Sequence, residues 1–352
     1  MEVASALRGV KFGCYGPVYA LSIIRRSFLK NPGKSHAHSA VSSYTSLHSS
    51  MQKIVPHLWF DKEAKEAAEF YVDAFGNGSK VTHVSTLHDT PSGDCDIVSF
   101  DLGGYSFMAI SAGPIFTLNP CISFMLNFNP SQDKQAREHL DALWGKLSDG
   151  GKPLMPLQEY PFSKRYGWIE DKYGVNWQLI LTNPDGEPRP FIMPSMMFTG
   201  DMTGKAGEAI DFYVSIFKNS KRGFSAPYPP GAAPEKAAKL MFAEFMIEGQ
   251  WFTAMDSGHM HNFTFNEALS LMVQCKDQQE IDEYWAKLSA HPENEQCGWL
   301  KDKYGVSWQI TPAEMQEMMR RGSEEQIARV TQAFMPMKKF DVATLKKAYE
   351  GK

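Results

Sequence analysis

A twelve-residue segment that ends on glutamine occurs twice in this sequence. GWIEDKYGVNWQ ends at Gln178, and GWLKDKYGVSWQ ends at Gln309. A glutamine amide donates and accepts hydrogen bonds, and its carbonyl oxygen can ligate a cation without contributing charge. The two glutamines either line a binding site at matching positions or are structural amides that hold a hairpin, and the sequence leaves both interpretations open.

Three histidines stand where they could take part in chemistry. His57 lies in the short apolar segment IVPHLWF, where a single histidine is either a ligand or a hydrogen-bonded structural residue. His259 and His261 occur in DSGHMHNF close to Asp256, a combination that could hold a metal. This second segment is rich in loop-forming residues, so a solvated loop is the favoured interpretation.

Common motifs of covalent, phosphate and S-adenosylmethionine chemistry are missing from the sequence. GxSxG and GxxxxGK[ST] do not occur, and no glycine-rich turn joins a strand to a helix in a doubly wound domain. The five cysteines are scattered and never form CxxC. This pattern is typical of a reducing compartment and argues against a zinc cluster or a disulfide framework.

The chemically interesting residues lie within a tandem duplication. IVPHLWF matches IMPSMMF, EFYVDAF matches DFYVSIF, and FTLNPCISFML matches FTFNEALSLMV, in the same order in both halves. The sequence therefore predicts an extension at residues 1–50, a first domain at 51–182, a linker at 183–191, a second domain at 192–312 and a helical tail at 313–352. Apolar residues at helical intervals predict two short helices in the tail, docked on the second domain.

Each repeat has the pattern of two βαβββ units. A short apolar strand, a helix with alanine and aromatic residues on one face, and three strands separated by glycine, proline and aspartate clusters precede a second set of similar elements. DKYG forms the last hairpin turn, because Gly174 and Gly305 can adopt a positive φ. Alternation along VNWQLIL then places Trp177 and Gln178 on opposite faces of the sheet.

Composition and charge exclude several classes of partner. The chain is 43% hydrophobic with a net charge of −4, and no apolar run approaches the roughly 20 residues of a membrane span. We therefore expect a soluble protein with no nucleic-acid partner and no membrane partner. Residues 1–50 are basic and rich in serine, which is typical of either a mitochondrial transit peptide or an unstructured extension of a cytoplasmic protein.

The repeated segments resemble the vicinal oxygen chelate superfamily, which includes glyoxalases, bleomycin-resistance proteins and extradiol dioxygenases. The resemblance is strongest to its PhnB-like branch, labelled 3-demethylubiquinone-9 3-methyltransferase domains, and covers about residues 54–350. LWFDKEAKEAAEFYVDAF, EYPFSKRYGWIEDKYGVNWQLIL and CGWLKDKYGVSWQI carry it. It implies an α+β fold of tandem domains, each with two βαβββ units that form a curved mixed sheet.

The resemblance also implies a site on the concave side of each sheet. Metal-using relatives carry histidine or glutamine on an early strand and glutamate on a late one, whereas this chain has glutamine at the late position. We therefore expect no catalytic metal and no other cofactor; if a divalent metal binds, His57 and Gln178 are the first ligands. If each repeat builds its own cavity, Gln178→Glu should increase metal affinity more than Gln309→Glu. The expected pocket-lining residues are His57, Met108, Ser123, Gln178, Ser195, Met255, Ser270 and Gln309.

Two hypotheses for the function remain. In the first, the cavity binds a small amphipathic or aromatic molecule without a catalytic metal. In the second, the protein is a metal-dependent lyase, isomerase or dioxygenase of the superfamily. The missing carboxylates favour the first hypothesis. No catalytic residue is assigned, a homodimer is a possible assembly, and the methyltransferase label is a family name without an S-adenosylmethionine motif to support it.

Overall fold

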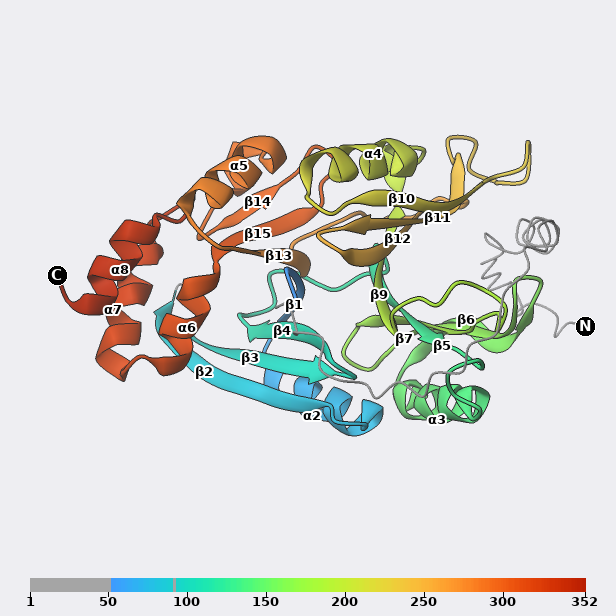
Figure 1. Ribbon diagram of the computed structural model, residues 1–352, viewed down its shortest axis with the longest axis horizontal. Coiled ribbons are helices and arrows are strands. Elements are labelled where there is room, and N and C mark those ends of the chain that lie inside the picture. The colour runs from blue at the N-terminus through green and yellow to red at the C-terminus, as the bar shows by residue number, and fades with distance from the viewer. Residues whose placement is uncertain (1–51, 91–92) are drawn as a thin grey trace, which may run out of the picture.

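The computed structural model describes residues 52–90 and 93–352, so the predicted extension at residues 1–50 lies outside the described residues. These residues form two curved mixed sheets with helices around them (Figure 1). The predicted α+β class and the two mixed sheets are therefore confirmed. The seven-stranded sheet has the order β14 (Trp299–Lys301), β15 (Ser307–Pro312), β13 (Leu269–Cys275), β1 (Ile54–Phe60), β4 (Tyr105–Ser111), β3 (Gly93–Leu102) and β2 (Lys80–Thr90).

The eight-stranded sheet has a matching arrangement with one additional strand. Its central strands β9 (Ile192–Phe198) and β5 (Ile122–Phe128) pair antiparallel, as β1 and β13 do in the other sheet. In the seven-stranded sheet, β1 from the first half of the first repeat therefore pairs with β13 from the second half of the second repeat. In the eight-stranded sheet, β9 from the first half of the second repeat pairs with β5 from the second half of the first repeat. The order is β10 (Lys221–Pro227), β11 (Leu240–Ile247), β12 (Gln250–Asp256), β9 (Ile192–Phe198), β5 (Ile122–Phe128), β8 (Asn176–Leu181), β7 (Ser163–Glu170) and β6 (Lys152–Tyr160).

Each sheet combines one unit from each repeat, which differs from the expectation that each repeat forms its own sheet. The short linker explains the exchange. It leads from β8 to β9, and these strands lie in the same sheet with only β5 between them. The second repeat therefore starts beside the last unit of the first, as expected for elements joined by a short connection.

The last unit of the second repeat lacks one strand, so the predicted second βαβββ unit is wrong there. Between α5 (Gln278–Leu288) and β14 the chain forms only a short 3₁₀ helix, Pro292–Asn294, where the first repeat has β6. The C-terminal tail occupies part of this region. Backbone amides of Cys297 and Gly298 donate to the carbonyl oxygens of Met337 and Lys338, each at 2.7 Å.

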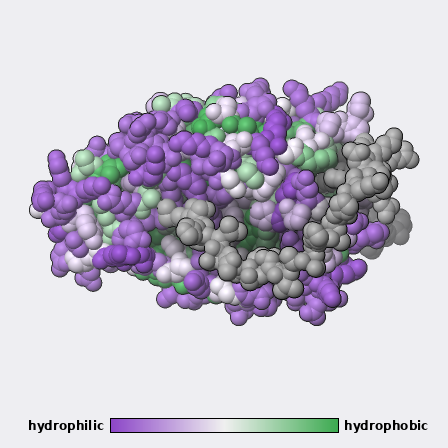
Figure 2. All heavy atoms as spheres, in the orientation of Figure 1, coloured by the Kyte–Doolittle hydropathy of each residue, from purple (hydrophilic) through white to green (hydrophobic). Residues whose placement is uncertain are grey.

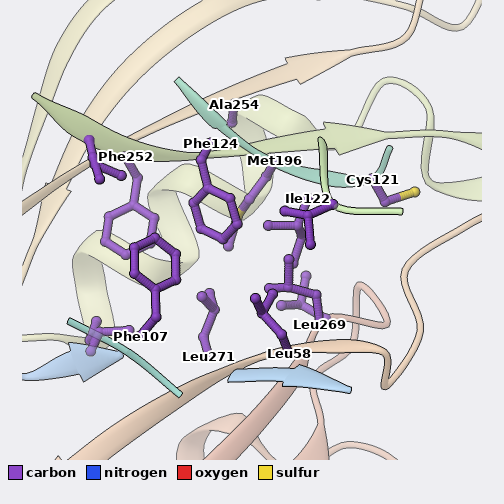
Figure 3. Close-up of a cluster of buried hydrophobic side chains, with 14 of the residues drawn as sticks. Leu58, Phe107, Cys121, Ile122, Phe124, Met196, Phe252, Ala254, Leu269 and Leu271 are labelled. Atoms are coloured by element: carbon purple, nitrogen blue, oxygen red, sulfur yellow. The ribbon is translucent and has the colours of Figure 1, made fainter. Parts of the chain in front are cut away.

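A continuous hydrophobic core joins the two sheets. Phe107 on β4 and Phe124 on β5 meet with ring centroids 4.9 Å apart, and Phe124 also contacts Trp177 (Figure 3). Hydrophilic side chains cover most of the face seen in Figure 2. The flanking helices bury alanine, leucine, isoleucine and tyrosine at helical spacing; they are α2 (Ala64–Phe75), α3 (Ala136–Ser148), α4 (Ala206–Ile216) and α5 (Gln278–Leu288).

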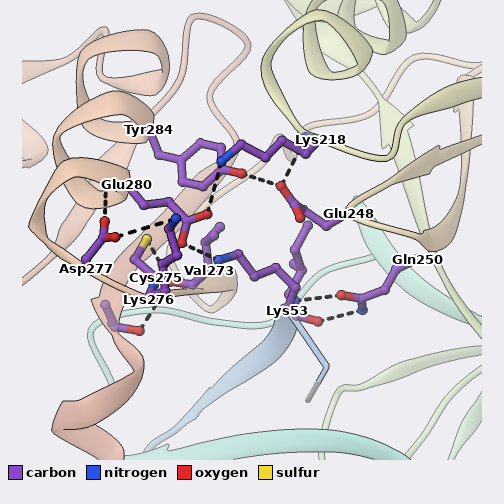
Figure 4. A network of polar contacts seen from close by, with 12 residues as sticks. Lys53, Lys218, Glu248, Gln250, Val273, Cys275, Lys276, Asp277, Glu280 and Tyr284 are labelled. Carbon is purple, nitrogen blue, oxygen red and sulfur yellow. Dashed lines mark hydrogen bonds and ion pairs between the residues drawn. The ribbon is translucent and has the colours of Figure 1, made fainter. Parts of the chain in front are cut away.

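A polar network also joins the two sheets at their junction (Figure 4). Lys53, just before β1, contacts the buried carboxylate of Glu280 on α5 at 2.5 Å. Glu280 also accepts a bond from the Lys276 backbone amide at 2.8 Å and lies 3.6 Å from the ammonium of Lys218, which follows α4 on the eight-stranded sheet. The side-chain amide of Gln250 on β12 accepts a hydrogen bond from the Ile54 backbone N–H and donates one to the Ile54 carbonyl oxygen.

Three helices form the C-terminal tail, where the sequence predicted two. They are α6 (Ala313–Arg321), α7 (Glu324–Phe334) and α8 (Val342–Glu350). α6 contacts β15 and β2, and α7 also contacts β2, so the tail touches both repeats and not the second alone. No helix among residues 52–90 and 93–352 is long and apolar enough to cross a membrane.

Candidate ligand-binding cleft

Gln178 lies at the centre of a hydrogen-bonded group on the eight-stranded sheet. Its Oε1 accepts a bond from the Tyr166 hydroxyl at 2.7 Å. Its Nε2 donates to Ser123 Oγ at 2.8 Å and to Ser195 Oγ at 3.3 Å. These four side chains come from β8, β7, β5 and β9, and all are uncharged. The structure therefore brings Gln178, Ser123 and Ser195 together, although Ser195 belongs to the other repeat.

A cleft of about 530 Å³ opens beside this group. Gln178 and Met255 line it, as expected from the sequence. Its walls combine flexible thioethers with aromatic rings, a composition that is typical of sites for small molecules. The apolar and aromatic lining residues are Met125, Phe162, Tyr166, Trp168, Ile180, Leu181, Phe224, Met241, Phe242, Trp251 and Met255.

Charged groups also line the cleft. Arg189 in the linker donates from Nε and Nη2 to Glu244 Oε2, at 3.1 Å and 2.8 Å, and from Nη1 to Glu187 at 3.0 Å. Its guanidinium also lies 4.3 Å from the centroid of the Trp251 ring. Lys221 lies 5.3 Å from the same ring. The cleft is therefore amphipathic, with a mostly apolar lining that also contains charged groups.

The other four predicted residues gather on the seven-stranded sheet. His57 is the cross-strand neighbour of both Met108 and Ser270. Gln309 Nε2 donates to Ser270 Oγ at 2.9 Å, which repeats the bond between Gln178 and Ser123. The eight predicted residues thus form two groups of four, each with two members from each repeat.

His57 is buried and has an unpartnered nitrogen. Its side chain is 4% exposed, its Nδ1 has no hydrogen-bond partner, and its ring packs edge-on against Trp299 at 5.8 Å between centroids. Burial lowers the pKa of His57 to about 4, so the imidazole is neutral at physiological pH. In the eight-stranded sheet the equivalent position is Ser195.

The residues around Gln178 do not fit a divalent metal. Both ends of its amide are engaged, and its partners are two serines and a tyrosine whose pKa is raised by burial. Hard divalent cations need several oxygen donors, usually with carboxylates among them. His57 lies in the other sheet, so the expected pair of His57 and Gln178 is divided between two sites. Across the described part of the chain, no group of three or more His, Cys, Asp or Glu residues could hold a metal.

The segment with His259 and His261 also differs from a metal centre. His261 Nε2 lies 2.8 Å from Ser257 Oγ, and its ring stacks on Phe263. Burial and the nearby His259 lower the pKa of His261. The carboxylate of Asp256 accepts bonds from four backbone amides, those of Gly204, Ala206, Lys239 and Leu240. Asp256, the last residue of β12, therefore has a structural role: it links the beginnings of α4 and β11.

Sequence reasoning missed most of the cleft walls. Tyr166 and Trp168 alternate with Gly167 on β7, and this alternation is the signal that could have placed both rings on the concave face. Arg189 gave no such signal, because a linker has no periodicity.

Thr253 was also missed by sequence reasoning. It is the cross-strand neighbour of Ser195, as Met108 is of His57. Its buried hydroxyl has no hydrogen-bond partner.

Comparisons with known proteins agree with the repeat structure. The family described as 3-demethylubiquinone-9 3-methyltransferase matches residues 52–180 and 190–311. The PhnB protein from Bacillus cereus is 35% identical over 37% of this chain and 100% of its own, with a TM-score of 0.33. Glyoxalase I from Zea mays is 12% identical over 75% of this chain and 93% of its own, with a TM-score of 0.47. Among curated proteins none matches.

The two matched segments span more than half of the chain and correspond to the two repeats. The predicted resemblance is therefore confirmed. This chain belongs to the PhnB-like 3-demethylubiquinone-9 3-methyltransferase family, whose model matches once in each repeat.

Proposed function

We propose that the cleft on the eight-stranded sheet binds a small amphipathic or aromatic molecule without a catalytic metal. The observation that carries this proposal is the cleft itself: about 530 Å³ of space between methionine and aromatic side chains. This volume lies within the range of roughly 300–1,000 Å³ that is usual for small-molecule sites. The apolar body of the ligand would contact Met125, Trp168 and Met255.

The polar groups of the cleft would orient the ligand. Gln178 is fixed by Tyr166 and Ser123, so its amide presents a defined dipole beside the apolar walls. The ion pair between Arg189 and Glu244 also lines the cleft and can meet a polar substituent of the ligand. Neutral groups at the centre favour binding over metal-assisted chemistry. The methyltransferase description of the family adds no reaction to this proposal, because the sequence has no S-adenosylmethionine motif.

A fluorescence titration tests the proposal directly. The probe is N-phenyl-1-naphthylamine, a neutral aromatic amine whose emission rises in apolar surroundings. We expect the full-length protein to bind this probe saturably. Ile180→Trp, which adds bulk to the cleft wall beside Gln178, should weaken binding at least tenfold because it fills the space that the probe needs.

Ile115→Trp is the matched control, because Ile115 is 67% exposed and lies outside the cleft lining. It should bind the probe as the wild type does. Absence of saturable binding by the wild type would contradict the proposal. Equal weakening by both substitutions would also contradict it, because the probe would then bind elsewhere.

A further inference from the structure

The cleft beside Gln178 on the eight-stranded sheet is called the open cleft below. The concave face of the seven-stranded sheet repeats its polar centre. Gln309 bonds to Ser270 as Gln178 bonds to Ser123. Met272 is the cross-strand neighbour of Gln309, and Met125 is the cross-strand neighbour of Gln178. Met125 lines the open cleft. The glutamine–serine pair and the methionine beside it are therefore present twice in one chain.

The C-terminal helices cover this second face. α6 contacts β15 near one edge of the sheet and β2 at the other edge, so it crosses the concave side (Figure 1). α7 and α8 follow it and pack Val330, Phe334 and Leu345 against a cluster that includes Leu87 and Cys95 of the sheet. These apolar contacts keep the tail docked.

The polar groups beneath the tail are poorly matched to it. Gln316 of α6 reaches over the sheet, where its Nε2 lies 3.8 Å from both Met108 Sδ and Met272 Sδ. A thioether is a weak acceptor, so the amide donor gains little from these contacts. His57 Nδ1 and Gln274 Oε1 are buried on the same sheet without hydrogen-bond partners. Buried polar atoms without partners are rare in folded proteins and call for an explanation.

We infer that this face is a second binding site for the same class of ligand, closed by the protein's own C-terminal helices. The inference rests on the proposed function of the open cleft. An amphipathic molecule with a planar apolar body would replace α6 against Met108 and Met272, close to the Trp299 ring that packs on His57. One hydrogen-bonding group on that molecule would give His57 or Gln274 the partner that the tail does not provide.

Hydrogen exchange on the wild-type protein tests the inference with the chain intact. A ligand that binds only when the tail is displaced must increase the population of that state. Saturating N-phenyl-1-naphthylamine should therefore accelerate amide exchange in α6–α8 at least threefold, whereas β5 and β8 should exchange no faster. Unchanged exchange in α6–α8 would overturn the second site.

Loosening the tail provides a second, independent test. Phe334→Ala removes an apolar contact of the docked tail and should convert one bound probe per chain into two. Adding His57→Leu should remove the second binding event, and adding Ile180→Trp should remove the first. Alkylation of Cys95, which lies under the tail, should accelerate in Phe334→Ala, whereas that of Cys121 and Cys275 in the central core should not.

The outcomes separate the two proposals. Probe binding that is lost with Ile180→Trp, together with one equivalent in the Phe334→Ala variant, would overturn the second site and leave the open cleft intact. Absence of binding in every variant would overturn both. If Phe334→Ala unfolds the protein, all three cysteines will react rapidly, and hydrogen exchange on the wild type decides the question.

Discussion

The carboxylate of Asp302 accepts a hydrogen bond from the indole Nε1 of Trp308 at 2.9 Å, and Asp171 accepts the same bond from Trp177 at 2.7 Å. Each aspartate also accepts two backbone amides of its own turn; for Asp302 these are the amides of Tyr304 and Val306. The repeated DKYGVxW segment is therefore a hairpin held by a buried carboxylate. This segment is therefore repeated for two reasons: it folds the last hairpin of each repeat, and it places the glutamine that follows the hairpin.

Removing this carboxylate should destabilise the protein strongly. Asp302→Ala leaves the Trp308 indole, the Tyr213 hydroxyl and two backbone amides without their acceptor in a buried site. Because buried donors without partners are costly, we expect a loss of about 3 kcal/mol in the free energy of unfolding, measured by urea denaturation. Asp211→Ala, which removes an exposed carboxylate on α4, should cost less than about 1 kcal/mol. Similar losses in both variants would contradict the structural role.

Asp171 should make stability depend on pH in the mildly acidic range. Burial raises its pKa from 3.8 to about 6, although Trp177 and two backbone amides oppose the shift. Between these values the folded state binds a proton that the unfolded state has lost, so stability falls as pH rises through this interval and stays low above it. The full effect is about 3 kcal/mol.

Asp171→Asn removes this titration. The stability of the variant relative to wild type should therefore rise by about 2.4 kcal/mol between pH 4 and pH 7, which is most of the full effect, measured by urea denaturation at each pH. A constant difference between the two proteins across this range would show that Asp171 does not titrate there.

The sequence predicted the elements well and their association poorly. The duplicated segments, the strands and the tail follow from local patterns of apolar residues, turns and repeats. Which units share a sheet does not, because β1, β5, β9 and β13 are similar strands and each can pair with any of the others. Only the short linker after β8 selects the observed pairing.

Because local patterns do not show how the units associate, only part of the candidate site could be predicted from the sequence. Gln178 and Gln309 were recognised because both repeats carry them, and each proves to line or occupy a concave face while bonding to a serine. His57 was assigned to the wrong partner because the units were assigned to the wrong sheets. Arg189 and the aromatic cleft walls depend on how distant strands curve together, and no single segment contains that information.

Gly298 should tolerate no side chain, because the tail packs directly on it. Its φ is +82°, and an added Cβ would lie 2.4 Å from the Phe340 ring. Gly305 has a φ of +83° with open space around it, so it is a matched control. Gly305→Ala should cost about 1–2 kcal/mol from backbone conformation alone. Gly298→Ala should cost about 2 kcal/mol more in urea denaturation. Equal costs would mean that the contact with Phe340 is relaxed easily.

Glu280 should be essential to the junction between the two sheets. Burial raises its pKa, but Lys53, the Lys276 amide and Lys218 outweigh this effect, so the net shift is downward. Glu280→Ala would leave Lys53 without its buried partner and should lower the free energy of unfolding by about 3 kcal/mol. Glu283→Ala on the same helix removes only a bond to Gln279 and should cost less than about 1 kcal/mol. Thermal denaturation of both variants would reveal the difference.

Restoring a carboxylate should create metal affinity in one sheet more than in the other. His57 shares the seven-stranded sheet with Gln309, and both residues flank Ser270. The eight-stranded sheet has Ser195 at the position of His57. The ranking predicted for separate repeat cavities is therefore reversed: Gln309→Glu should bind Zn²⁺ or Ni²⁺ at least tenfold more tightly than Gln178→Glu, because only it combines a carboxylate with a neutral imidazole. Titration calorimetry on both variants, with His57→Leu added to Gln309→Glu as a control, measures the difference. Tighter binding by Gln178→Glu, or no loss on removing His57, would contradict this assignment of ligands.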